Sequence, residues 1–167
     1  MKKKILFFTL VITIFISCNQ KFSNQNLNGK IENNDWDCKT AFTTTNPSDS
    51  SQMEIIFYNQ ELEEPCNNTV SDDFISISCP AKVGVHKFDK NNLQAFFYSK
   101  QNTKIAFEGI IEIMSIDTGE KINGRINAKI DAKNYISGVF EADFCQNKNL
   151  YNFMNEMENT IDTLMKN

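Results

Sequence analysis

The sequence is poor in the side chains that do most acid–base chemistry near neutral pH. Among 167 residues it has one histidine, His86, and one arginine, Arg125. A nucleophilic triad needs a histidine that is oriented by a carboxylate and lies beside an activated serine or cysteine. His86 lies in VGVHKF, and the sequence has no G-x-S-x-G, P-loop, G-x-G-x-x-G or H-E-x-x-H motif. We therefore interpret His86 as an edge-strand residue and assign no catalytic residue.

Positive charge is also scarce, and it is scattered. The chain has 17 basic and 21 acidic residues, a net charge of −4. A nucleic-acid-binding protein needs a basic stripe to neutralise phosphates, and this chain has none. Attachment to a membrane surface by charge alone needs a cluster of lysines or arginines, which is missing as well. The composition argues against a nucleic-acid partner and against a purely electrostatic membrane partner.

Long apolar runs are limited to one, from Ile5 to Ile16, which follows three lysines and precedes Ser17 and Cys18. Its twelve residues are fewer than the roughly 20 that cross a bilayer as a helix. A basic start, a short apolar run and a small residue before the cleavage site are typical of a secretory signal peptide. We expect residues 1–17 to be a lipoprotein signal peptide and Cys18 to be acylated, for example with palmitate; the alternative is an ordinary secretory peptide.

Cleavage there would leave 150 residues with 14 basic and 21 acidic side chains, a net charge of −7. That length suits one domain. Residues 19–34 are polar, so residues 18–34 are predicted to be the lipidated cysteine and a flexible tether. Residues 35–167 are predicted to be the folded domain.

Four cysteines remain after Cys18, an even number in an exported chain, which predicts two disulfides. Three pairings are possible. We favour Cys66 with Cys79, a short loop, and Cys38 with Cys145, which would join the first strand to the last. The cysteines form no C-x-x-C pair and only one histidine is present, so a zinc site is not expected. No D-x-D-x-D run with a glycine turn indicates calcium, and no cofactor is predicted.

Alternating polarity predicts a mainly β fold of about seven strands, an antiparallel sandwich or a partly open barrel. The clearest hairpin has apolar residues on one face of 122–130 and 136–144, joined by a turn at 131–134. Further strands are expected at 36–42, 53–60, 72–79, 93–99 and 104–116, with a short extended piece at 82–88.

The period then changes to that of a helix. From Asn149 onward, apolar residues recur at helical spacing: Leu150, Phe153, Met154, Met157, Ile161, Leu164 and Met165. This predicts one C-terminal helix over 149–166 that packs on the sheet or closes a barrel end. A methionine-rich partner groove is the alternative.

Two kinds of function remain open. A non-catalytic binding or envelope-associated module would use an exposed patch, for which we select Phe96, Phe97 and Tyr98. One form of this is an inhibitor or immunity protein that blocks an envelope hydrolase with loop 61–70. The competing class is a hydrolase with paired carboxylates, for which the candidates are Asp35/Asp37, Glu63/Glu64 and Asp72/Asp73.

Four sequence features resemble one group of proteins. They are Phe15-Ile16-Ser17-Cys18, the low-complexity tether that follows it, the D-W-x-C-x-T-A-F start at 35–42, and the hairpin KINGRINAKIDAKNYISGVFEADF at 121–144. Together they resemble the small lipoproteins of unknown function that are common in Bacteroidetes. The resemblance implies an anchored outer-membrane protein and transfers no catalytic residue. Surface-displayed lipoproteins of these bacteria carry acidic residues after the cysteine, whereas Asn19, Gln20 and Lys21 follow here, which favours the periplasmic face.

Overall fold

The computed structural model describes residues 22–45, 50–66, 73–90, 93–99, 102–117 and 119–145. The signal peptide expected over 1–17, Cys18 and the helix expected over 149–166 lie outside this part of the chain. The described residues form eleven strands and no helix. The strands are β1 (Asn28–Ile31), β2 (Asn34–Asp37), β3 (Thr40–Thr45), β4 (Gln52–Tyr58), β5 (Phe74–Pro80), β6 (Gly84–Lys87), β7 (Gln94–Ser99), β8 (Asn102–Ala106), β9 (Glu108–Asp117), β10 (Lys121–Asp131) and β11 (Asn134–Cys145).

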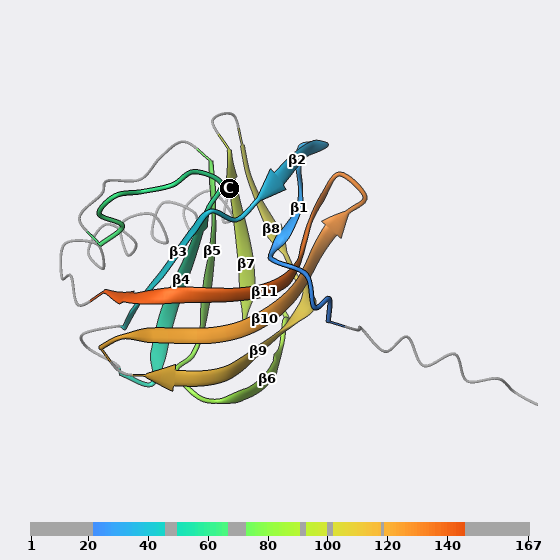
Figure 1. Cartoon of the computed structure of the whole chain (residues 1–167). Coiled ribbons are helices and arrows are strands. Elements are labelled where there is room, and N and C mark those ends of the chain that lie inside the picture. The colour runs from blue at the N-terminus through green and yellow to red at the C-terminus, as the bar shows by residue number, and fades with distance from the viewer. Residues whose placement is uncertain are drawn as a thin grey trace, which may run out of the picture.

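All eleven strands belong to one curled sheet that forms an open half-barrel (Figure 1). The main path runs β6-β9-β10-β11-β3-β4-β5-β7-β8, and the β1–β2 hairpin branches from β11. Neighbours along the path are antiparallel except β11 and β3, which are parallel over Asp143–Cys145. The long β11 therefore has two partners on its second edge, first β1 and then β3.

The expected mainly β, partly open architecture is confirmed, but the expected number of strands is too low. The segment 36–42 forms two strands, because the chain leaves the sheet at Cys38 and Lys39. As a result Trp36 and Phe42 lie in different apolar clusters. The segment 104–116 is also divided, at Phe107, into β8 and β9.

The tether expected over 18–34 is wrong for its second half, because β1 lies inside it. Leu27 and Ile31 are buried, and the chain from Gln25 to Lys30 bonds to β11. The segment passes so close to Gly138 that a Cβ there would lie 2.6 Å from the Leu27 Cα. A glycine at φ 148° leaves room for this crossing. The folded domain therefore begins by residue 22.

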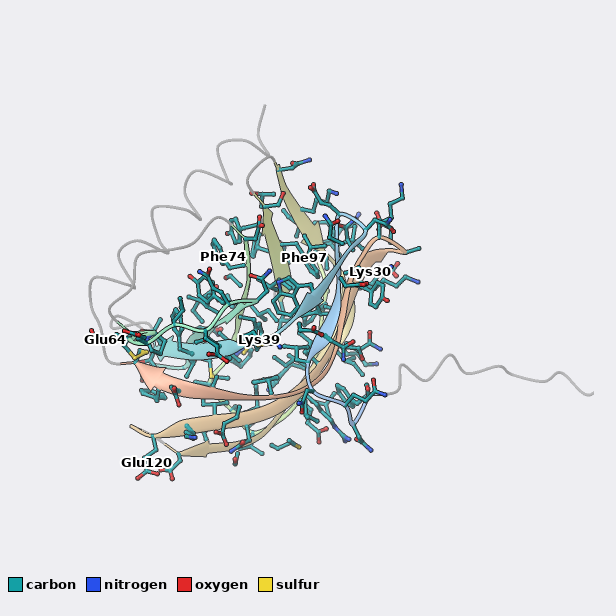
Figure 2. The ribbon with its side chains drawn as sticks, turned by 45° about the horizontal axis from the view of Figure 1, so that its top comes forward. Lys30, Lys39, Glu64, Phe74, Phe97 and Glu120 are labelled. Carbon is teal, nitrogen blue, oxygen red and sulfur yellow. A yellow bond between two sulfur atoms is a disulfide. The ribbon has the colours of Figure 1, made fainter. Side chains whose placement is uncertain are left out.

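The concave side of the sheet holds the main core, as Figure 2 shows with Phe97 pointing into it. The predicted 122–130/136–144 hairpin is confirmed as β10–β11, with Ile122, Ile126, Ile136 and Ala142 fully buried. The Phe140 ring lies over its cross-strand partner Gly124, where a side chain would clash. No helix long and apolar enough to cross a membrane occurs in the described ranges.

A second apolar cluster lies on the convex side of β3, β4, β5 and β7. Its rings stack from strand to strand, with centroids 5.8 Å apart for Phe42 and Tyr58, 5.7 Å for Tyr58 and Phe74, and 4.2 Å for Phe74 and Tyr98. We call these rings, with Phe96, the outer aromatic row. Cross-strand pairs such as Tyr58–Phe74 and Phe74–Tyr98 place them on one face.

Candidate functional site

A pocket of about 160 Å³ lies at the end of the sheet where β4 and β7 end and β5 begins. The β1–β2 hairpin forms one wall, and the strand ends form the other. The lining side chains are mostly polar: Ile31, Glu32, Asn34, Asp35, Trp36, Asn59, Asp73 and Ser99. Sites for drug-sized ligands occupy about 300–1,000 Å³, so this pocket suits a smaller molecule.

The rim of the pocket is a tight two-residue turn. Ile31 pairs with Asn34, which leaves Glu32 and Asn33 as the loop, with φ of 53° and 70°. Two successive positive φ values define a type I′ turn, which suits the twist of a hairpin. Asparagine tolerates this region, but for glutamate it costs about 1–2 kcal/mol. Local strain is thus retained at the mouth of the pocket.

Two bonds hold Glu32 in this position. Its backbone N–H donates to Oδ1 of the buried Asn134, at 2.9 Å, and its carboxylate lies 3.5 Å from Lys104 Nζ. Lys104 also donates to Asn134 Oδ1 at 3.5 Å. Asn134 in turn donates to Asp131, and these bonds lower the pKa of the Asp131 carboxyl. The network joins β8 to the β1–β2 and β10–β11 hairpins and fixes the pocket mouth.

Trp36 carries the most informative atom of the site. Its side chain is only 3% exposed, and its Nε1 has no hydrogen-bond partner among the described residues. Buried polar groups are nearly always hydrogen-bonded, and leaving one unpaired costs about 1–3 kcal/mol. Trp36 also lines the pocket, so its indole forms part of the pocket wall.

The charged lining of the pocket is partly balanced. Asp35 lies 3.6 Å from Lys30 Nζ, and Glu32 is paired with Lys104 as described above. Asp73 adds a third carboxylate to the lining. The pocket thus offers several carboxylate and amide groups, with lysines beside two of the carboxylates and an indole in its wall. This arrangement matches a neutral polyhydroxyl molecule or a zwitterion.

The carboxylate pairs considered from the sequence do not assemble as expected. Asp35 lines the pocket, whereas Asp37 lines a separate polar hollow of about 540 Å³ between residues 24–28 and the β2–β3 link. Glu63 and Glu64 are exposed in the loop after β4, and Asp72 lies outside the described residues. No group of three potential metal ligands occurs in the described part of the chain.

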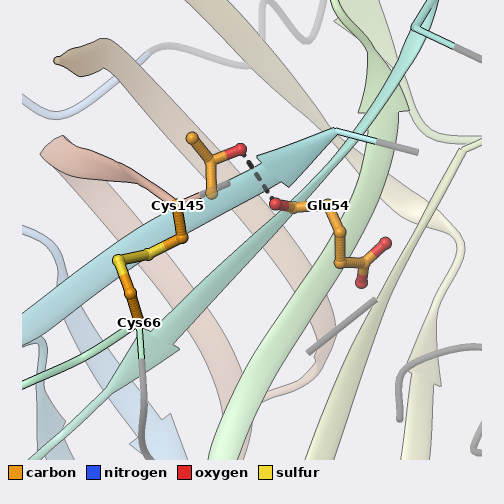
Figure 3. The surroundings of a disulfide bond; sticks show 4 residues. Glu54, Cys66 and Cys145 are labelled. Atoms are coloured by element: carbon orange, nitrogen blue, oxygen red, sulfur yellow. Dashed lines mark hydrogen bonds between the residues drawn. A yellow bond between two sulfur atoms is a disulfide. The ribbon is translucent and has the colours of Figure 1, made fainter. Parts of the chain in front are cut away.

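The disulfide differs from the expected pairings. Cys66 is joined to Cys145, with Cα atoms 5.3 Å apart and a sequence separation of 79 (Figure 3). Cys38 and Cys79 are free thiols. Cys79 points into the core from the end of β5, opposite Met53, and so cannot reach Cys66.

The loop after β4 explains how Cys66 reaches the end of β11. Thr40 donates to the Gln60 carbonyl at 2.9 Å, and its hydroxyl accepts the Leu62 N–H at 3.1 Å. These bonds hold the loop along β3, whose parallel partner β11 ends at Cys145. The disulfide therefore joins this loop to the end of β11, where β11 runs parallel to β3.

The two free thiols, Cys38 and Cys79, have raised pKa values and are therefore weakly reactive. Burial raises the pKa of the Cys38 thiol to about 12, and the thiol donates to the Thr40 carbonyl. Burial and the nearby Glu54 carboxylate raise the pKa of Cys79 further. The thiolate is the reactive form of cysteine, so neither residue suits a nucleophile or a redox centre.

The aromatic patch selected from the sequence does not form as an exposed surface. Phe97 is 1% exposed and belongs to the main core. Phe96 and Tyr98 are half-buried on the opposite face, where Tyr98 stacks on Phe74 in the outer aromatic row. Adjacent residues of a strand point to opposite faces, and this divides the patch.

His86 lies on β6, which is an edge strand as expected, since β6 pairs only with β9. Its Nε2 donates to the Lys82 carbonyl at 2.9 Å. The ring thus caps the bend before β6 and lies outside both hollows described above.

Sequence reasoning missed most of the pocket. Its hairpin turn, Glu32-Asn33, lacks the glycine that marks type I′ turns, and Asn59, Asp73 and Ser99 meet only because three strands end together. The usable signal was Trp36, the single tryptophan of an otherwise polar stretch. No family model, curated protein or solved structure matches this chain.

Proposed function

We propose that this protein is a lipid-anchored cell-envelope lipoprotein whose folded domain binds a small polar ligand without transforming it. The ligand-binding part of this proposal is carried by Trp36, which lines the pocket at the β1–β2 hairpin and has a buried indole N–H without a partner among the described residues. The apolar run at 5–16 followed by Ser17 and Cys18 supports the anchor, on the periplasmic face of the outer membrane.

The chemistry of the pocket defines the ligand. It must offer an acceptor to the Trp36 N–H, and hydroxyl or ammonium donors to the carboxylates of Asp35 and Asp73. A single sugar ring with an amide, such as N-acetylglucosamine, has both groups, and so does a free amino acid. A diamine such as putrescine has donors only and lacks the acceptor.

Calorimetric titration of the soluble domain with these three probes tests the proposal. We expect N-acetylglucosamine or an amino acid to bind and putrescine to fail. Losing a hydrogen bond to a charged group costs about 1.5–3 kcal/mol, so Asp73→Asn should weaken binding about tenfold or more. Trp36→Phe removes one neutral N–H donor and should weaken binding about two- to tenfold while the core remains packed. Asp37→Asn, in the other hollow, is the matched control and should leave affinity unchanged. The proposal is wrong if neither acceptor-bearing probe binds, or if putrescine binds as well as they do.

A specific observation favours a second candidate, an inhibitor or immunity protein. The Cys66–Cys145 disulfide and the Thr40 bonds fix the start of loop 61–70 on the sheet. A loop held in this way loses little entropy on binding an enzyme. Replacing Glu63 and Glu64 with alanine should abolish inhibition of envelope hydrolases under this second reading and leave ligand binding at Trp36 intact.

We also propose that residues 149–166 form the amphipathic helix that their apolar spacing indicates. They follow Cys145, which belongs to the same apolar cluster as the outer aromatic row. Deleting 149–167 should lower the helical signal in circular dichroism and increase binding of a hydrophobic dye. An unchanged spectrum would contradict this helix.

A further inference from the structure

Three large apolar side chains in the described part of the chain are exposed, and they lie together. Val83 and Val85 are 55% and 56% exposed at the start of the edge strand β6, and Met114 is 46% exposed on the adjacent β9. Met114 is the extra residue of the bulge in β9, because Asn123 pairs with Ser115 and Gly124 with Ile113. Gly84 pairs with Ile113, which places Val83 beside Met114.

These side chains share a face of the sheet with the first described residue. Val85 pairs with Glu112, and Glu112 pairs with Arg125, so the three form a row across β6, β9 and β10. The row spans two strand spacings, about 10 Å. Arg125 is paired with the Glu112 carboxylate, and its Cζ lies 4.5 Å from the centre of the Phe22 ring. We call Phe22, Val83, Val85, Glu112, Met114 and Arg125 the anchor face.

The position of Phe22 matters because of its distance from Cys18. Four peptide steps separate the two residues, and a fully extended chain spans at most about 14 Å over that length. A stacked arginine–aromatic contact holds Phe22 on the domain. An acyl group on Cys18 therefore keeps the lipidated residue within about 14 Å of Phe22, at the Arg125 end of the anchor face.

The composition of the anchor face suits this position. Its one arginine and one glutamate neutralise each other, so the face does not repel lipid headgroups. Lys82 and Lys87 are exposed at either end of the Val83–Val85 stretch. Lysines next to apolar side chains place their ammonium groups among headgroups while the apolar groups enter the interface.

We propose that the anchor face rests on the lipid surface that holds Cys18, with Val83, Val85 and Met114 inserted at the headgroup level. This inference depends on the lipid anchor in the proposed function. It fixes the orientation of the domain: the outer face of β6, β9 and β10 is against the membrane.

The test uses the full chain, processed and acylated in a bacterial host and placed on vesicles of phosphatidylethanolamine and phosphatidylglycerol with brominated phosphatidylcholine. Trp36→Phe removes the native tryptophan, and Val85→Trp or Thr103→Trp introduces one reporter. Thr103 is the matched control, because it is exposed on β8, the other edge strand of the path. Bromine on the acyl chains quenches a tryptophan that lies about 5–10 Å into the interface.

We expect Val85→Trp to lose most of its emission on brominated vesicles and Thr103→Trp to keep its emission. Equal quenching of both, or of neither, in protein that sediments with the vesicles would overturn the orientation but leave the anchor intact. Emission of Val85→Trp that changes with protein concentration and not with brominated lipid would show that a second copy covers the face, which also overturns the proposal. If the protein carries no acyl group and does not sediment, the lipid anchor itself fails.

Hydrogen exchange of the otherwise unmodified acylated chain gives a second readout that needs no tryptophan variant. On vesicles, peptides covering 82–87 and 112–116 should exchange several-fold more slowly than in the Cys18→Ala protein in solution. The peptide covering 102–106 should exchange equally in both. Unchanged exchange at 82–87 on vesicles would contradict the proposal.

Discussion

Removing the Cys66–Cys145 disulfide is the sharpest test of the topology. The bond joins the loop after β4 to the last residue of β11, and the two cysteines are 79 positions apart in sequence. Cross-linking a loop of that length removes chain entropy from the unfolded state, which corresponds to about 4.5 kcal/mol at 25 °C. The variant Cys66→Ala/Cys145→Ala should lose stability of this order, and its melting temperature should fall by roughly 10–20 °C.

Urea unfolding monitored by Trp36 fluorescence measures this loss, because the chain has a single tryptophan and it lies in the main core. Cys38→Ala is the matched control. It removes a thiol that forms no disulfide and donates to the Thr40 carbonyl, so it should cost about 1 kcal/mol. Treating the unmodified protein with a reductant should reproduce the double variant. A loss below about 1 kcal/mol in the double variant, or peptide mapping that finds Cys38 or Cys79 in a disulfide, would refute this connectivity.

Three further predictions follow from buried groups and from one close backbone contact. Cys38 and Cys79 should resist alkylation in the folded protein near pH 8, because burial raises the pKa values of both thiols. After unfolding without reductant, thiol titration of the domain should detect both of them, two thiols per chain. A titration that detects fewer than two would contradict the free state of both cysteines. The free energy of unfolding should be highest below about pH 9 and should fall as the pH rises toward 12. The reason is that the pKa values of Cys38 and Tyr58 are 9.0 and 10.0 in the unfolded chain, whereas burial raises both to about 12 in the folded protein. Urea unfolding across this pH range measures the fall, and an equally steep fall in Tyr58→Phe would exclude the tyrosine as a cause. Gly138→Ala should destabilise the fold by roughly 2–4 kcal/mol, because the added Cβ would clash with Leu27. Gly84→Ala is the control: its φ is similar but the space around it is open, so it should cost only about 1 kcal/mol. Equal melting temperatures of the two variants would contradict the packing of the N-terminal segment against β11.

Strands with regular alternation could be predicted from the sequence, because burying one face imposes a period of two. The β10–β11 hairpin and the antiparallel β4–β5 pair both follow from such patterns. The same rule failed where the chain leaves the sheet, at Cys38 and at Phe107, since two strands that follow one another closely keep an unbroken alternation in sequence.

Contacts between distant segments could not be predicted in this way. The sequence around β1 is mostly polar, because only Leu27 and Ile31 are buried there. The strand forms because it pairs with the backbone N–H and C=O groups along the second edge of β11. Cys66 and Cys145 meet through the parallel β11–β3 pair, which nothing in the spacing of the cysteines indicates. Of the candidate pocket, the sequence pointed to the carboxylates Asp35 and Asp73, as members of two different pairs, but not to the strand ends that complete the pocket.

Binding of a small polar ligand at Trp36 is the central claim, and its indole resonance tests that claim most directly. The single tryptophan gives one indole N–H cross-peak in a nitrogen–proton correlation spectrum of the labelled domain. Titration with N-acetylglucosamine or a free amino acid should shift this cross-peak downfield and saturate, as the unpartnered N–H gains an acceptor. Putrescine should leave it in place. An indole cross-peak that stays unmoved by every acceptor-bearing probe, while other resonances shift, would contradict the account.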